Sequence, residues 1–224
     1  MRADLHTHAL SSSRDSRMTV AVLAEAASAA GLEAIAITDH LPGTDFAAAE
    51  RECSERGITL IPGREVGCAL GHVLVFSTDR GWLAALPPVV ELPLVGDRNG
   101  PVAFVWAHPA GWRVGGAMAP PEPSRGASFM HGIEMLNGER LWQDRGVEIA
   151  RSLCDELGLA ACGGSDAHDA GSVGRCLTEA PEASDALSFI EALMAGAVRP
   201  VLSKRWAAAN NIDYQRADLI GSLE

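Results

Sequence analysis

Residues 19–40 read TVAVLAEAASAAGLEAIAITDH and contain one complete helix–strand unit. Thr19 is a typical N-cap, and the alanine-rich stretch after it stops at Gly31, a typical residue just beyond a helix C-terminus. The apolar run at 33–38 then predicts a short strand. Because His40 follows this strand directly, the same unit indicates both an element of the fold and the place of a site.

Other apolar runs of strand length follow along the chain, with helical patterns between several of them. The runs lie at 55–67, 71–77, 101–111, 131–138, 158–168 and 197–202, and the further helical patterns at 44–56, 139–157 and 184–196. Short, continuously apolar strands that alternate with helices indicate parallel strands covered on both faces, and therefore an α/β fold.

The polar clusters of the chain stand at the carboxyl ends of these apolar runs. A closed barrel collects such side chains at one mouth, whereas an open, doubly wound sheet gathers them along a crevice. We predict a single domain over residues 1–224 with a distorted TIM-like barrel; the doubly wound sheet is the alternative. The Pro- and Gly-rich stretch 110–128 is either a lid or a plain surface loop. Residues 203–224 form a C-terminal tail or docked helix, or a dimer arm.

Composition limits the partners and the compartment. The 224 residues are enough for one compact domain, and 29 acidic against 18 basic residues give a formal net charge of −11. This charge argues against nonspecific attraction to nucleic acid or to an anionic membrane. Five scattered cysteines without a CxxC pair suit a reducing compartment, and we find no membrane span or signal peptide. We expect a soluble, cytoplasmic protein.

The segment DLHTH at residues 4–8 places His6 and His8 two positions apart. Residues at this spacing in a strand point to the same face, so both imidazoles could bind one ion, although a lone pair of this kind is more often two ordinary histidines. The joint pattern is more specific, because four other histidines and two carboxylates also stand at the edges of apolar runs. These residues are His40, His72, His108, His168, Glu65 and Asp166.

This set of residue types indicates a centre with more than one metal ion. Imidazoles with carboxylates, and no thiolate in any cluster, favour Zn²⁺, Mn²⁺ or Fe²⁺ over Ca²⁺ or an iron–sulfur centre. The ligands suffice for two or three ions, with a carboxylate bridging a pair. A pair of ions can clamp the attacking and leaving oxygens of an in-line displacement, which is typical of phosphate ester hydrolysis.

The ordered segments DLHTH, ITDH, PGREVG, GH, AHP, IEMLNG and GGSDAH resemble the PHP family, the polymerase and histidinol phosphatase superfamily of metal-dependent phosphoesterases. The resemblance covers residues 3 to about 202. It implies a distorted (β/α)7 barrel of seven strands and seven helices, with up to three metal ions at the carboxyl ends of the strands.

The resemblance also implies how the ligands are divided among the ions. The first ion would be held by His6, His8, Glu65 and Asp166. The second would share Glu65 and add His72 and His108. The third would be held by His40, His168 and Asp15. Asp15 comes from SSSRDSR, where many members of the family have Ser-Asp-Gly at a shorter offset, so the choice between two and three ions depends on Asp15.

The implied reaction is hydrolysis of a phosphate mono- or diester through a metal-bridging hydroxide, with the ions neutralising charge on the phosphoryl oxygens. We name Glu65, Asp166 and His168 as catalytic residues; either His168 or a metal-bound water would protonate the leaving alcohol. Arg17 and Arg113 lie beside ligand motifs and suit bidentate phosphate binding. In so arginine-rich a chain, proximity by chance is the alternative.

Several polar and aromatic residues near the motifs have two interpretations. Glu134 and Asn137 either support the site or substrate, or simply end a strand, and His131 is a loop or strand-start residue rather than a ligand. Three tryptophans could stack on a base or sugar, or pack in the core and lid. They are Trp106, Trp112 and Trp142.

Three functions are compatible with the sequence. A phosphoesterase would act on a small phosphorylated metabolite, a nucleotide or a short oligonucleotide, because the acidic charge disfavours long duplexes. A barrel amidohydrolase shares the HxH and a late Asp, but a carbamylated lysine is excluded because Lys204, the only lysine, lies outside every motif. An inactive metal-binding accessory module would show a broken ligand set, whereas this set is nearly intact.

Overall fold

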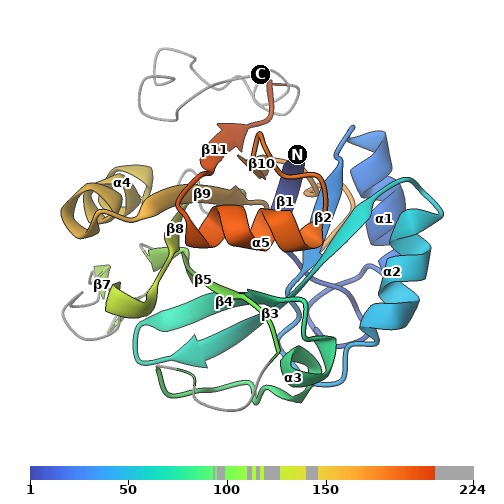
Figure 1. Ribbon diagram of the computed structural model, residues 1–224, viewed down its shortest axis with the longest axis horizontal. Helices are drawn as coiled ribbons and strands as arrows, with labels where there is room; N and C mark the ends of the chain where they lie inside the picture. The colour runs from blue at the N-terminus through green and yellow to red at the C-terminus, as the bar shows by residue number, and fades with distance from the viewer. Residues whose placement is uncertain are drawn as a thin grey trace.

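The computed structural model describes residues 1–92, 94, 99–109, 127–139 and 146–204, together with the backbone of 113–114 and 117–118. Within these residues a single mixed sheet of nine strands curves into a nearly closed barrel (Figure 1). Its strands, in spatial order, are β11 (Arg199–Leu202), β10 (Cys176–Glu179), β1 (Arg2–Thr7), β2 (Ala34–Ile37), β3 (Thr59–Cys68), β4 (Gly71–Ser77), β5 (Val102–Ala107), β8 (Gly132–Asn137) and β9 (Ala160–Gly164). The predicted distorted barrel is confirmed. The short strands β6 (Arg113–Val114) and β7 (Ala117–Met118) pair separately.

The direction of the strands differs from the all-parallel expectation. The neighbours β1–β2–β3 and β5–β8–β9 are parallel, but β4 is antiparallel to both of its neighbours. Only two residues join β3 to β4, which is enough for a hairpin and far too few for a parallel crossover. Strand β10 is likewise antiparallel to β1 and β11. The sheet has nine strands, against the seven that the resemblance implies.

Five α-helices occur in the described part of the chain, against the seven that the resemblance implies. They are α1 (Val20–Ala29), α2 (Phe46–Ser54), α3 (Arg80–Ala85), α4 (Gly146–Leu157) and α5 (Ala186–Met194), with a 3-10 turn at Ala127–Phe129. Helix α1 has the predicted signals: Thr19 accepts a hydrogen bond from the Val22 N–H, and Gly31 beyond its end has φ of 74°. Helix α3 was not predicted.

Helix α5 fills the amino end of the barrel, where it crosses the strands in Figure 1. Its buried side chains Phe189, Ile190 and Leu193 join one apolar cluster with Ala3 of β1 and Ala103 of β5, which lie near the starts of their strands. A capping box of Asp185 and Ser188 fixes the start of this helix. With the amino end filled, the carboxyl ends of the strands form the accessible mouth.

Strand β1 and the segment after β9 meet at this mouth. The His8 N–H donates to the Ala167 carbonyl at 3.0 Å, and the Ala167 N–H donates to the His6 carbonyl at 3.2 Å. These bonds join β1 to the segment that follows β9. Two residues of DLHTH and the loop containing GSDAH are therefore neighbours, although they are about 160 positions apart in the chain.

A second apolar layer lies outside the barrel. Trp106 is fully buried in this layer, and its indole N–H donates to the Leu70 carbonyl at 3.0 Å, so its role is core packing. Trp112 and Trp142, and most of the predicted lid 110–128, lie outside the described residues, as do 205–224 of the predicted tail.

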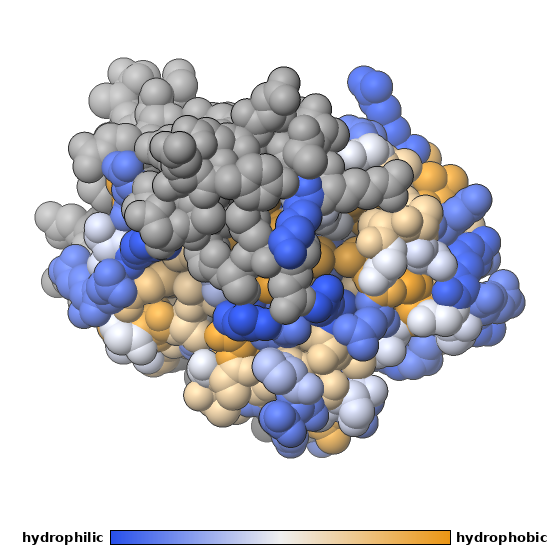
Figure 2. All heavy atoms as spheres, turned by 90° about the horizontal axis from the view of Figure 1, so that it is seen from above, coloured by the Kyte–Doolittle hydropathy of each residue, from blue (hydrophilic) through white to orange (hydrophobic). Residues whose placement is uncertain are grey.

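The surface, the cysteines and the lengths of the helices can be compared with the expectations from composition. Among the coloured residues of Figure 2, hydrophilic side chains are interrupted by small hydrophobic patches. All five cysteines are free thiols. No helix in the described residues is long and apolar enough to cross a membrane.

Candidate metal centre

The structure brings all nine predicted ligands to the mouth of the barrel. Each comes from a strand or from the loop directly after one: His6 from β1, His8 and Asp15 after β1, His40 after β2, Glu65 from β3, His72 from β4, His108 after β5, and Asp166 and His168 after β9. Neighbouring imidazole rings lie between 4.5 and 5.9 Å apart, centre to centre. Three groups have ligand atoms within 4.8 Å of one another: His6, His8 and Asp166; His6, Glu65 and His108; and His8, His40 and His168.

The first group, taken together with Glu65, has the dimensions of a single ion site. His6 Nε2 lies 3.1 Å from Glu65 Oε2 and 3.4 Å from Asp166 Oδ1, and His8 Nε2 lies 3.4 and 3.3 Å from the same two oxygens. Ligands at bond lengths of about 2.0–2.1 Å around a tetrahedral ion stand about 3.3–3.4 Å apart. The buried Nε2 atoms of both histidines and Oε2 of Glu65 also lack hydrogen-bond geometry to any partner. These residues fit a metal ion.

Glu65 occupies the centre of the cluster and is almost completely buried. Its Oε2 atom faces His6 and also lies 3.2 Å from His40 Nδ1. Its Oε1 atom faces the other way and lies 2.7 Å from His72 Nδ1 and 3.1 Å from His108 Nε2. A carboxylate whose two oxygens face different imidazole groups has the arrangement of a bridge between two ions.

Asp15 lies beside the third group despite its long offset from His8. Its Oδ2 atom is 3.3 Å from His40 Nε2 and 3.4 Å from His168 Nε2. The His168 ring in turn donates from Nδ1 to the Asp166 carbonyl at 2.8 Å. The loop SSSRDSR thus delivers a half-exposed carboxylate to the place where the resemblance requires one.

The electrostatics of the cluster favour a bound cation. Burial alone would lower the pKa of His6, but Asp166, Glu134 and Glu65 reverse this effect and raise its pKa well above the usual value. Burial lowers the pKa of His8 to about 4. Burial opposes ionisation of Glu65 and Asp166, yet the surrounding imidazoles lower the pKa of both carboxyls. Ionised carboxylates and neutral His8 are the protonation states that metal binding requires, and an ion between these carboxylates would replace the proton that they favour on His6.

Two of the candidate ligands have a strained backbone. Among the described residues, His108 with φ of 29° and Asp166 with φ of 56° are the non-glycine residues at positive φ. Such conformations are unfavourable for residues with a Cβ and concentrate at functional sites. Strain at two separate loops that meet in one cluster agrees with a functional role for that cluster.

A polar network behind the ligands could not be recognised from the sequence. Ser13 Oγ lies 3.2 Å from His8 Nδ1, donates to Asp39 Oδ1 at 3.1 Å and accepts from the His40 N–H at 3.2 Å. Burial raises the pKa of Asp39 to about 6. Arg64, which precedes Glu65, donates to the backbone carbonyls of Asp39 and His40.

Of the two predicted phosphate-binding arginines, the structure describes Arg17 completely and only the backbone of Arg113. The Arg17 N–H donates to the His168 carbonyl at 3.0 Å, so this exposed residue stands beside the third group. The side chain of Arg113 lies outside the described residues.

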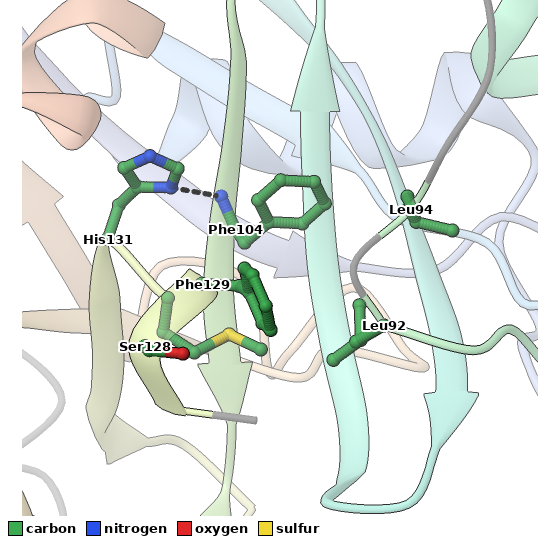
Figure 3. A pocket seen from close by; sticks show the side chains of 7 residues that line it. Leu92, Leu94, Phe104, Ser128, Phe129 and His131 are labelled. Carbon is green, nitrogen blue, oxygen red and sulfur yellow. Dashed lines mark hydrogen bonds between the residues drawn. The ribbon is translucent and has the colours of Figure 1, made fainter. Parts of the chain in front are cut away.

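The seventh histidine belongs to a different cavity. His131 Nδ1 accepts a hydrogen bond from the Phe104 N–H at 3.0 Å, and the two rings stack 5.8 Å apart (Figure 3). This pocket of about 340 Å³ is lined by Leu92, Leu94, Phe104, Ser128, Phe129, Met130 and His131. Most of the residues that line it have apolar side chains, and His131 lies apart from the candidate ligands, as its sequence position suggested.

The fold and the ligand groups together define an α/β barrel with buried groups of residues that could hold metal ions. The PHP domain model matches residues 4–98, and the model of the PHP-associated region matches residues 147–198. The chain belongs to the PHP family. No protein of curated function matches it by sequence.

Three solved structures share the fold. PsfC from Pseudomonas syringae PB-5123 is 21% identical with a TM-score of 0.69, over 96% of this chain and 98% of PsfC. An amidohydrolase from Chromobacterium violaceum, with sulfate and no metal, is 17% identical with a TM-score of 0.56, over 85% and 96% of the two chains. A protein of Bifidobacterium adolescentis, provisionally named a metal-dependent phosphoesterase, is 16% identical with a TM-score of 0.52, over 75% and 88%.

Proposed function

We propose that this chain is a metal-dependent phosphoesterase that hydrolyses a phosphate mono- or diester of a small metabolite, a nucleotide or a short oligonucleotide. The observation that carries the proposal is Glu65, whose two oxygens face separate imidazole groups. Membership of the PHP family supports it, as does the name of the Bifidobacterium protein that shares the fold.

Divalent Zn²⁺, Mn²⁺ or Fe²⁺ ions, two or three in number, would supply Lewis acidity, neutralise phosphoryl charge and lower the pKa of a water molecule. The first site would use His6, His8, Glu65 and Asp166. The second would use Glu65, His72 and His108. The third would use Asp15, His40 and His168.

The residues at the mouth suggest how protons and substrate are handled. His168 donates its Nδ1 proton to a backbone carbonyl, so the lone pair of Nε2 faces the mouth, which suits a ligand. Of the two alternatives, His168 or a metal-bound water, we therefore favour the water for protonation of the leaving alcohol. Arg17, beside the third site, and Arg113 are the candidate phosphate-binding cations. The net charge of −11 argues for a small substrate rather than a long duplex.

The test is a phosphate-release assay on protein that has been stripped of metal and reloaded with Zn²⁺, Mn²⁺ or Fe²⁺. Aryl phosphates, an aryl phosphodiester, nucleotides and short oligonucleotides cover the proposed substrates, and an aryl amide covers the amidohydrolase alternative. We expect His8→Ala to lose both metal and activity. The control His131→Ala removes a partly buried histidine that lies outside the cluster, so it should retain both metal and activity. Full activity in a metal-free preparation would contradict the proposal.

A further inference from the structure

Glu134 of β8 is a buried carboxylate that lies directly behind the candidate ligands. Its Oε1 atom is 2.9 Å from His6 Nδ1. Its Oε2 atom accepts from the His108 N–H and from Asn137 Nδ2, both at 2.9 Å. Glu134 is 2% exposed, so water at the mouth competes little for hydrogen bonds to its two oxygens.

Asn137 extends this contact to a third ligand. Its Nδ2 group also donates to Asp166 Oδ2 at 3.2 Å, while its Oδ1 atom accepts from the Glu139 N–H at 3.1 Å. One pair of side chains on β8 thus touches ligand residues contributed by β1, by the loop after β5 and by the loop after β9. Strand β8 supplies none of the nine candidate ligands itself.

Each atom that faces Glu134 is a nitrogen able to donate, and a carboxylate can only accept. Neutral His6 must therefore carry its proton on Nδ1, which leaves the lone pair on Nε2. Nε2 is the atom that faces Glu65 Oε2 and Asp166 Oδ1. We propose that Glu134 is a positioning residue that fixes the tautomer and orientation of His6 for metal binding, with Asn137 linking it to Asp166. This inference rests on the metal centre of the proposed function.

Gly164 of β9 leaves the room that this contact needs. A Cβ at this position would lie 2.5 Å from the His6 Cβ and 2.8 Å from Glu134 Oε1. Such distances are closer than any real contact allows, so only glycine permits the carboxylate and the imidazole to meet here. Sterics therefore require glycine at the second position of the GGSDAH motif, next to the ligand His6.

His8 is supported differently, which makes the role of Glu134 specific to His6. The ring atom His8 Nδ1 faces the hydroxyl of Ser13, and that hydroxyl donates its proton to Asp39. The hydroxyl can then accept from His8, but it carries no charge. A carboxylate partner holds an imidazole more firmly and makes its other nitrogen a better ligand.

The test is Glu134→Gln. One carboxylate oxygen becomes an NH₂ group, which must face either the two donors at Oε2 or the single ring nitrogen of His6. If the NH₂ group faces His6, it meets one donor instead of two, so we expect this orientation. His6 Nδ1 must then accept the hydrogen bond, which is possible for the neutral ring only if its proton is on Nε2. In ¹⁵N-edited NMR of the metal-free protein, at a pH high enough for His6 to be neutral, we expect the remaining His6 proton on Nδ1 in the native chain and on Nε2 in the variant.

Zinc affinity provides the second readout. Because the variant places a proton on the ligand atom, we expect Zn²⁺ to bind about 10–100-fold more weakly. The matched control is Glu179→Gln, the same change on β10, where the carboxylate pairs with Arg2 and Arg199 away from the mouth. This control should keep the His6 tautomer and the zinc affinity of the native chain.

Two results would overturn the inference. A neutral His6 ring with its single proton on Nε2 in the native metal-free protein refutes it without any variant, even if Glu134→Gln fails to fold. An unchanged tautomer with unchanged zinc affinity in a folded Glu134→Gln protein also refutes it. Neither readout depends on turnover, so absence of phosphoesterase activity would contradict the proposed function alone.

Discussion

Arg64 offers a sharp test of how the fold holds the ligand loops. It is fully buried in β3, and its guanidinium donates to the carbonyls of Asp39 and His40 at 2.8 Å. It also donates to the carbonyls of Leu83 and Leu86 at 3.3 and 3.2 Å. One side chain therefore ties the loop after β2, which carries a ligand, to the end of α3.

The substitution Arg64→Met keeps most of the volume and removes the donors. Leaving the two closest carbonyls without a donor costs about 1–3 kcal/mol each. Part of this cost is offset because the variant no longer has to bury a positive charge. We expect a net loss of about 3 kcal/mol in the free energy of unfolding. With a urea m-value of about 2–3 kcal/mol per molar, the unfolding midpoint should fall by about 1–1.5 M.

Urea unfolding of the metal-free protein, followed by circular dichroism, measures this loss. The control Arg80→Met makes the same change in a residue whose side chain is 38% exposed and pairs with Glu50 at the surface. It should cost at most about 1 kcal/mol. A midpoint that moves no further in Arg64→Met than in Arg80→Met would refute the view that the buried guanidinium holds these loops together.

Three further predictions concern sterics, pH and metal. Gly164→Ala should fail to fold or lose more than about 3 kcal/mol of stability in thermal unfolding, because its Cβ would lie 2.9 Å from the His6 backbone nitrogen. Burial lowers the pKa of His131, which also accepts the Phe104 N–H, so the unfolded chain binds this proton more tightly. Stability should therefore fall as the pH drops below about 6.5, and less so in His131→Asn, which keeps an acceptor without titrating. Adding Zn²⁺ at about 100 times its Kd to chelator-treated protein should raise the free energy of unfolding by about 2.7 kcal/mol per site; an unchanged melting temperature would contradict metal binding.

The sequence was informative where a local pattern determines both an element and its end. Thr19 and Gly31 mark the two ends of a helix that the structure contains at Val20–Ala29, with Thr19 as its N-cap. The candidate ligands stand at strand ends in a fixed order, so their meeting follows once the strands form a barrel. Even Asp15, with its unusual offset, lies beside His40 and His168.

The sequence was uninformative where an interaction depends on a partner that is distant in the chain. Nothing in PGREVG indicates that Arg64 binds the carbonyls of residues 83 and 86. An apolar run alone does not give strand direction, so the antiparallel β4 was missed although the short link at 69–70 allows little else. Glu134 gave only an ambiguous signal, because its partners are contributed by β1 and by the loop after β5.

The strained loops and the Glu134 network are two parts of one arrangement. Positive φ costs roughly 1–3 kcal/mol for a residue with a Cβ, and glycine would remove this cost but also the ligand side chain. At His108 the strained backbone donates its N–H to Glu134, and at Asp166 the carboxylate accepts from Asn137. The bonds that orient the ligands therefore also hold the unfavourable backbone in place, which explains why β8 is central to the site without contributing a ligand.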